Sequence, residues 1–226
     1  MTRRRWLRAQ WPFAMRVLAD RLRSQQFTSE TQNGFILDRF RADSIECRFI
    51  ERQEISQIVE SPLGQRTVYE RTEFREIAFV ATPGNSPGLE IANPPRSVSL
   101  FLSRLSEVCD FQVSISEVKV DVVGWCARLA ELLGRPVDIV SCQLRDIKLA
   151  DNATATAVIR GSSDVRAAAN LMMNGNPYIN DKVKIQIQGR PLQSAILTRQ
   201  AAVTIDRNAS DTLLDSLRTS LYLSST

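Results

Sequence analysis

The sequence predicts an α+β protein built in two parts, residues 1–110 and residues 111–226. Apolar and polar residues alternate through most of 34–91, which is typical of antiparallel strands joined by short connections. Stretches with apolar residues spaced three and four apart flank these strands and indicate helices. Beyond residue 111, strand-like and helix-like stretches follow one another in the order β-α-β-β-α-β. At 226 residues, the chain is long enough to bury a core in each part.

The N-terminal stretch is basic and is expected to form a short arm followed by a helix over 12–26. Pro12 suits the first turn of a helix, and the apolar residues of 11–22 fall on one face. Residues 1–23 hold seven arginines against Asp20, a net charge of +6, whereas the whole chain carries +4. Such a segment can meet phosphates, an anionic membrane surface or an acidic partner.

Arginines and tryptophans of this stretch are the candidate binding residues. Arginine contacts phosphate, and a nearby aromatic ring can stack on a base. The alternative is an amphipathic helix that docks on the protein's own body and leaves its arginines in solvent. The candidates for a nucleic-acid interface are Arg3, Arg4, Arg5, Trp6, Arg8, Trp11 and Arg16.

The alternating region is expected to form an antiparallel β-meander. A turn at 61–64, with proline in its second position, leads into a long strand over 67–80, and a short strand at 89–91 ends the meander. The long strand carries charges on both faces, which indicates a stretch that projects into solvent or contacts another molecule. The alternative is cross-strand ion pairing with Arg39, Arg48 and Arg52.

A helix over 98–109 should pack on the meander, because its apolar residues recur at helical spacing. In the second part, the expected elements are a strand at 113–120, a helix between Asp121 and Gly134, strands at 136–149 and 153–159, a helix from Ser162 or Ser163 to Met172, and a strand at 182–188. This order predicts a ferredoxin-like α/β sandwich, with four antiparallel strands and two helices on one face. A strand at 194–205 and a helix at 211–221 would be additions.

Residues 164–187 carry a resemblance to a known family. They read DVRAAANLMMNGNPYINDKVKIQI and look like the second helix, Asn-Gly turn and last strand of an RNA recognition motif. The resemblance implies RNA binding, because that family stacks bases on aromatic side chains of its two central strands. Neither 113–120 nor 153–161 contains an aromatic residue, so the resemblance extends to topology and not to the stacking residues.

Several kinds of catalytic chemistry are excluded by composition. The chain has no histidine, which excludes Ser-His-Asp and Cys-His hydrolases and histidine-ligated metal sites. No glycine-rich phosphate-binding motif occurs. The four cysteines lack metal-binding spacing, and we expect them to be reduced and buried: Cys47, Cys109, Cys126 and Cys142.

Asp138, Asp146 and Lys148 resemble the acidic pattern of metal-dependent nucleases. No turn signal lies between the two aspartates, so they should share one strand, about 26 Å apart. At that distance they cannot hold one metal ion. We therefore assign no catalytic residue, no metal and no cofactor.

Two function classes remain, and a third has no motif. The first is a non-catalytic nucleic-acid-binding or assembly subunit that contacts phosphates of RNA or DNA through the basic N-terminal stretch. The alternative is a protein-interaction or oligomerisation module of a larger complex, in which the apolar side of 11–22 docks on a protein partner or a second copy. The third is an enzyme that uses Mg²⁺ with carboxylates such as Glu46, Glu51, Glu70 or Glu73.

The sequence also bears on location. No run of about 18 apolar residues occurs that could span a membrane. Arginines interrupt the N-terminal stretch, unlike the apolar core of a secretory signal. We therefore expect a cytoplasmic protein with no membrane span.

Overall fold

The structure is a computed structural model that describes residues 1–84, 87–189, 192–206 and 211–222. Within these residues it contains eleven strands and five short helices, with 48% of the chain in strands and 24% in helices. The chain divides into two compact units, which are described separately. Unit 1 comprises Met1–Arg8 and Ile115–Thr226, and unit 2 comprises Ala9–Ser114.

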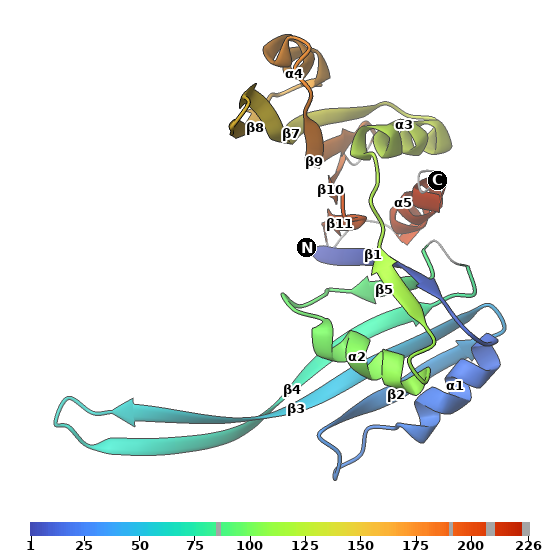
Figure 1. Ribbon diagram of the computed structural model, residues 1–226, viewed down its shortest axis with the longest axis vertical. Coiled ribbons are helices and arrows are strands. Elements are labelled where there is room, and N and C mark those ends of the chain that lie inside the picture. The colour runs from blue at the N-terminus through green and yellow to red at the C-terminus, as the bar shows by residue number, and fades with distance from the viewer. Residues whose placement is uncertain (85–86, 190–191, 207–210, 223–226) are drawn as a thin grey trace. The chain divides into compact units, whose positions relative to one another are not determined.

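Unit 2 contains four antiparallel strands with two helices on one face (Figure 1). The strands β2 (Asn33–Arg41), β3 (Ser44–Glu60), β4 (Arg66–Ala81) and β5 (Leu89–Ala92) pair in sequence order, and the helices are α1 (Met15–Ser24) and α2 (Ser99–Val108). Phe101 of α2 packs on Phe49 and Phe79, with ring centroids 5.8 and 4.9 Å apart. These rings form the centre of the unit's core.

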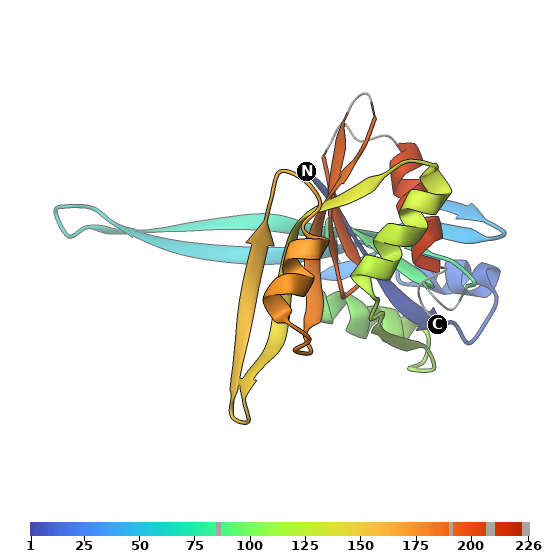
Figure 2. The same ribbon diagram turned by 90° about the horizontal axis from the view of Figure 1, so that it is seen from above.

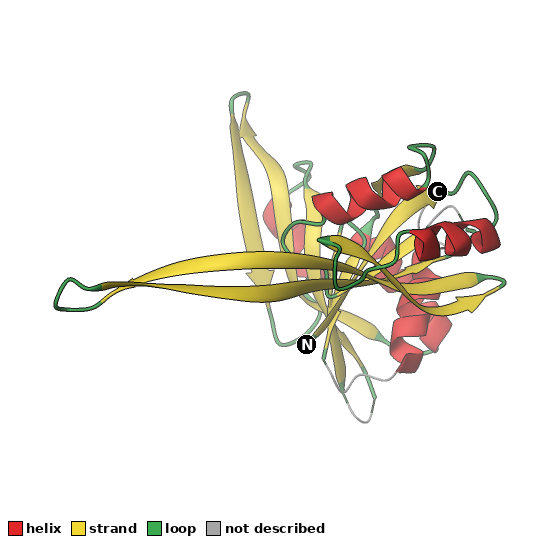
Figure 3. Ribbon diagram, turned by 90° about the horizontal axis from the view of Figure 1, so that it is seen from below, coloured by secondary structure: helices red, strands yellow, loops and turns green. Residues whose placement is uncertain are grey.

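β3 and β4 continue past this core as a long two-stranded hairpin (Figures 2 and 3). Their facing pairs run without a register shift from Ile45 and Ala81 to Glu60 and Arg66. None of residues 52–76 is buried, and we call this stretch the hairpin arm. The predicted turn at its tip is confirmed, since the Gly64 N–H donates to the Ser61 carbonyl at 2.9 Å and Gly64 has φ +79°.

Unit 1 is built on antiparallel strands in the order β1-β11-β10-β9-β7-β8, with β6 paired to β1. The strands are β1 (Thr2–Gln10), β6 (Ser114–Glu117), β7 (Val137–Ala150), β8 (Ala153–Arg160), β9 (Ile179–Ile187), β10 (Gln193–Thr198) and β11 (Ala202–Ile205). The helices are α3 (Val122–Leu133), α4 (Arg166–Met173) and α5 (Asp211–Tyr222). Trp6 and Trp125 meet edge to face at 6.0 Å inside one core, to which all three helices contribute.

The boundaries of α3 confirm two sequence signals. Both carboxylate oxygens of Asp121 accept backbone N–H groups, from Val123 and Gly124, at 3.1 Å. Gly134 ends the helix with φ +59°, the left-handed conformation that favours glycine. The capping residue predicted for α4 was Ser162 or Ser163, but α4 begins at Arg166, and the side chain of Asp164 accepts the Arg166 N–H at 2.9 Å.

The predicted α+β fold with a ferredoxin-like unit is wrong, because the protein is mostly antiparallel sheet with five short helices. The strand expected at 113–120 spans only Ser114–Glu117 and pairs with β1 instead of joining the expected four-stranded sheet. β9 lies between β7 and β10. Local patterns located these elements but contained no information on which strands pair.

The N-terminal stretch also differs from the prediction. Residues expected as a free arm form β1, in which Thr2 faces Ile205 and Arg5 faces Ala202. The helix expected over 12–26 is present but shorter, as α1 from Met15 to Ser24, so Pro12 precedes the helix and does not lie in its first turn. The single strand expected at 194–205 is a hairpin of β10 and β11. The N-terminal eight residues join the compact unit that resumes at Ile115.

Candidate functional site

The face of the unit 1 sheet opposite its core carries two rows of aligned side chains. Residues that face each other in an antiparallel ladder point to the same side of the sheet, so each row can be followed across the strands. From β8 to β1, the first row is Arg160, Ser141, Lys184, Ile196, Thr204 and Arg3. The second row is Val158, Gln143, Lys182, Thr198, Ala202 and Arg5.

Five cationic side chains thus lie on one side of one sheet, and we call this surface the basic face: Arg3, Arg5, Arg160, Lys182 and Lys184. The alternation within β9 explains their orientation. Lys182 and Lys184 are exposed, whereas Val183 and Ile185 between and beyond them are buried in the core. The core therefore holds the lysines outward.

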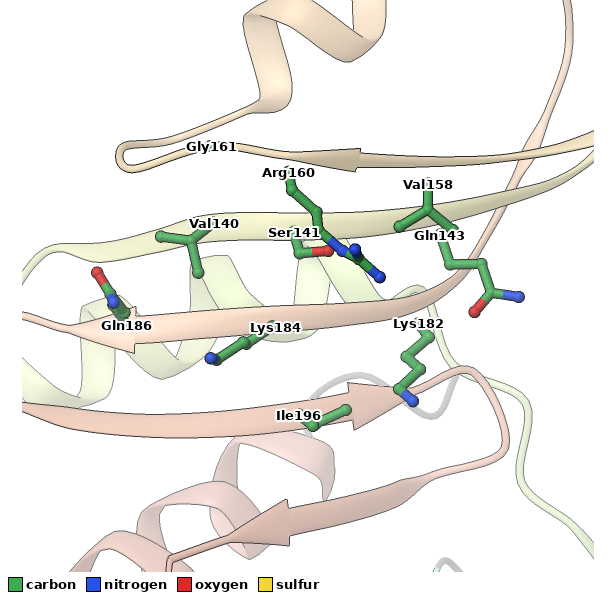
Figure 4. A pocket seen from close by; sticks show the side chains of 10 residues that line it. All are labelled: Val140, Ser141, Gln143, Val158, Arg160, Gly161, Lys182, Lys184, Gln186 and Ile196. Carbon is green, nitrogen blue, oxygen red and sulfur yellow. The ribbon is translucent and has the colours of Figure 1, made fainter.

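The basic face is hollowed where β7, β8, β9 and β10 run together. The hollow has a volume of about 420 Å³, and Figure 4 shows Arg160 extending from β8 across β7 toward the lysines of β9. Val140, Val158 and Ile196 supply its apolar wall, and its polar side chains include Ser141 and Gln143. No aspartate or glutamate is among its lining residues. The chemistry of the hollow therefore suits an anion with some apolar surface.

Three of these cations have no acidic partner in the part of the chain that the structure describes. Among the residues that the structure describes, Arg160, Lys182 and Lys184 form no ion pair of 4.0 Å or less. Arg5 differs, because its guanidinium meets the Glu117 carboxylate at 2.7 Å. Nearby, Asp181 lies 3.7 Å from Arg145. Three uncompensated positive charges therefore gather around the hollow.

The strand geometry sets the spacing of the charges. Lys182 and Lys184 are separated by about 7 Å along β9, at about 3.4 Å per residue. Adjacent strands lie about 4.8 Å apart, so the first row extends about 24 Å from Arg160 to Arg3. This array is long enough to contact several charges of an extended polyanion.

Net charge differs between the two units. Unit 1 contains 17 Lys and Arg against 11 Asp and Glu, whereas unit 2 contains 12 Arg against 14 Asp and Glu. The positive charge of the chain thus belongs to unit 1, and it is not confined to the N-terminal segment.

Four predicted contact arginines lie along β1 with different surroundings. Arg3 and Arg5 are on the basic face. Arg4 points to the other side, opposite the buried Val203, and is half-buried. Arg8 is exposed.

The two candidate tryptophans make contacts within the protein. Trp6 is 1% exposed and packs on Trp125, so its ring is inaccessible to a base. Trp11 is half-buried in unit 2, and its indole N–H donates to the carbonyls of Thr82 and Gly88 at 2.9 and 3.3 Å. Arg16 is exposed on α1 of unit 2.

The apolar side of 11–22 was predicted as a possible docking surface. It is part of the unit 2 core. Met15, Leu18 and Leu22 of α1 are each at most 4% exposed. At the end of the helix, Arg21 donates to the Val108 carbonyl at 3.1 Å and pairs with Asp110. α1 is therefore an amphipathic helix docked on its own unit.

Sequence reasoning did not find Arg160, Lys182 and Lys184. The signal was present in the alternation Lys-Val-Lys-Ile-Gln-Ile over 182–187, which is typical of a strand with one apolar and one polar face. That pattern does not reveal that Arg3 and Arg5, far away in the sequence, lie on the same face.

Cysteines and carboxylates are the reactive and metal-binding groups of this chain. All four cysteines are free and buried, as predicted, and burial raises the pKa of Cys47 to about 12 and of Cys109 to about 11. Glu51 and Glu73 lie near Arg75 and Arg71, at 4.0 and 2.7 Å. In the described part of the chain, no group of three or more Cys, Asp and Glu side chains is arranged to hold a metal ion.

No helix among the described residues is long and apolar enough to cross a membrane.

Comparison with known proteins gives no match to this chain, either among protein-family models or among curated proteins.

Proposed function

We propose that this protein binds nucleic acid through contacts between the basic face of unit 1 and the phosphate backbone. One observation carries the proposal: Arg160, Lys182 and Lys184 surround a hollow without acidic lining, on the same face as Arg3 and Arg5. Exposed cations on a rigid sheet bind phosphates and release the counterions condensed on the nucleic acid.

Binding of this kind is directed to the backbone and tolerates differences in base sequence. The two rows contain no aromatic side chain, so they offer no platform on which bases could stack. Phosphate contacts fix the position of a nucleic acid but carry no sequence information. We therefore expect similar affinity for strands of different sequence.

Salt dependence tests the proposal directly. Binding of labelled duplex DNA, single-stranded DNA and single-stranded RNA is measured by fluorescence anisotropy over a series of salt concentrations. With three to five phosphate contacts, the slope of log K against log salt on duplex DNA should lie between about −2.7 and −4.5. The variant R160Q/K182Q/K184Q should make this slope shallower by about 2 to 3.

A control with equal loss of charge separates the basic face from net charge. Arg96, Lys119 and Arg135 are exposed in loops, and neither row contains them. The variant R96Q/K119Q/R135Q should therefore keep the wild-type slope. Equal slopes for the two variants, or binding to phosphatidylserine vesicles without binding to any nucleic acid, would overturn the proposal.

Substitution is a cleaner test than removal of residues 1–10. Such a truncation would delete β1 together with Trp6, which is part of the unit 1 core. Loss of binding could then follow from unfolding alone.

A further inference from the structure

The outer edge of β4 in the hairpin arm has no neighbouring strand. β4 pairs with β3 along its whole length on one side, but with β5 only over residues 78–81 on the other. Within the described residues, the second edge of β4 is thus unpaired from Arg66 to Ile77. An unpaired edge presents backbone N–H and C=O groups that can accept a further strand.

The arm also exposes apolar side chains, although Phe74 meets Phe27 edge to face at a ring-centroid distance of 6.1 Å. Val68, Tyr69 and Phe74 are 56–58% exposed, and all three lie on β4. A two-stranded ribbon alone is only marginally stable in water, and a third strand or another packing surface stabilises it. A strand added along the outer edge of β4 would supply the third strand, and its side chains would supply a packing surface.

The charge sequence of this edge is complementary to itself. In a two-fold symmetric antiparallel pair, the residue at the centre faces its own copy, and residues equally far from the centre face each other. If Thr72 is at the centre, Arg71 faces Glu73 of the second copy and Tyr69 faces Arg75. Each of these pairs occurs twice in the dimer, because the two-fold axis repeats it. Opposite charges and a cation–aromatic pair then meet across the interface.

Neighbouring registers are disfavoured. Centres at Glu70, Arg71 or Glu73 place that charged residue against its own copy. A centre at Phe74 leaves only residues 71–77 to pair, because β5 occupies the edge from residue 78 onward. The register centred on Thr72 pairs 67–77 and brings no like charges together, so it combines length with charge complementarity. The edge of β3 specifies its register less strictly, since its charges in the arm are only Arg52, Glu54 and Glu60.

We propose that two copies of this chain form a dimer by pairing the outer edges of their β4 strands antiparallel, in the register centred on Thr72. The self-complementary charges identify the occupant of the edge as a second copy. This inference does not depend on nucleic-acid binding, because the arm belongs to unit 2 and the basic face belongs to unit 1.

Charge reversals test this register. Sedimentation velocity and size-exclusion chromatography with light scattering report the mass of the full chain over a dilution series. We expect a dimer for the wild type. R71E and E73R should each raise the dissociation constant by at least about tenfold, because each places like charges in contact.

Mixing separates contacts between copies from contacts within one chain. Arg71 and Glu73 also pair within the chain at 2.7 Å, so a single reversal disturbs that pair as well. An equimolar mixture of R71E and E73R restores opposite charges only between copies, and it should form a heterodimer. The double variant R71E/E73R should dimerise like the wild type.

A control variant and the contrary outcomes complete the test. R66E changes an exposed charge at the tip, outside the paired stretch, and should leave the dimer intact. A wild type that stays monomeric at every concentration would overturn the proposal. So would a dimer that R71E does not weaken, or single variants that fail to associate when mixed.

Discussion

The basic face of unit 1 and the hairpin arm of unit 2 are both β-structure rich in charge, but they differ in what lies behind them. Val183, Ile185 and Ile187 of β9, beneath the basic face, are buried in a core that includes Trp6 and Trp125. The arm has no buried residue between 52 and 76. A packed sheet holds charges at fixed spacing for an external ligand, whereas an unsupported ribbon must gain stability from whatever it pairs with.

Loss of an aromatic ring should distinguish the two regions most strongly. Trp125→Ala removes a ring that is 0% exposed, and it should lower the free energy of unfolding by about 3–5 kcal/mol. Phe74→Ala in the arm is the matched comparison, and because its ring is 58% exposed the cost should be below about 1 kcal/mol. Urea denaturation measures both values. Similar losses would mean that the arm is supported by packing after all.

A half-buried polar link in unit 1 should give an intermediate, pH-dependent effect. The Asp164 carboxylate accepts the Ile139 N–H at 3.1 Å and lies 2.9 Å from the Arg166 guanidinium. Burial acts to raise the pKa of this carboxyl, but hydrogen bonds from Arg166 and Ile139 outweigh it and lower the pKa below its usual 3.8. The ionised form is thus favoured by folding.

The sign of the pH effect follows from this. The stabilisation by Asp164 is complete above its unfolded pKa, and it is lost as pH falls through the lower folded pKa. Asp164→Asn should therefore cost about 1–2 kcal/mol at neutral pH. The difference from wild type should shrink as pH falls below the usual pKa of 3.8 and through the lower folded pKa. Unfolding in urea at several pH values measures it, and a difference that does not vary with pH would contradict the assignment.

The smallest effect is expected for an ion pair in the arm. Arg66 and Glu60 lie 3.0 Å apart, but their side chains are 72% and 53% exposed. Water and salt screen such a pair, so Arg66→Gln should change the free energy of unfolding by less than about 0.5 kcal/mol. Hydrogen exchange of the arm amides is the measurement. Strongly accelerated exchange in this variant would show that single surface pairs hold the ribbon together.

Local features of the molecule could be predicted from the sequence, and long-range ones could not. Asp121 and Gly134 set the ends of α3 through contacts within a few residues, and the turn at 61–64 is equally local. One partner of β1 is β11, about 200 residues later, and no periodicity in either segment identifies the other. The same limit explains why the ferredoxin-like sheet was predicted from element order alone.

The candidate site shows the same division between local and long-range information. Arg3 and Arg5 were recognised by the concentration of charge near them, whereas Lys182, Lys184 and Arg160 stand in weakly charged surroundings. These five residues lie on one face of the sheet because of the register of five strand pairings. Trp6 was assigned to bases because a neighbour in sequence was basic, but its own side of β1 points into the core.

Unit 1 is formed by two separate segments of the chain, and this affects folding during translation. β1 leaves the ribosome about 200 residues before its neighbour β11. At about 5–20 residues per second, Trp6 must wait roughly 10–40 s for the strand that helps to cover it. Unit 2 can fold during that interval, because all its strands lie between. Such distant pairing slows folding, so newly made chains should depend most on chaperones before β11 emerges.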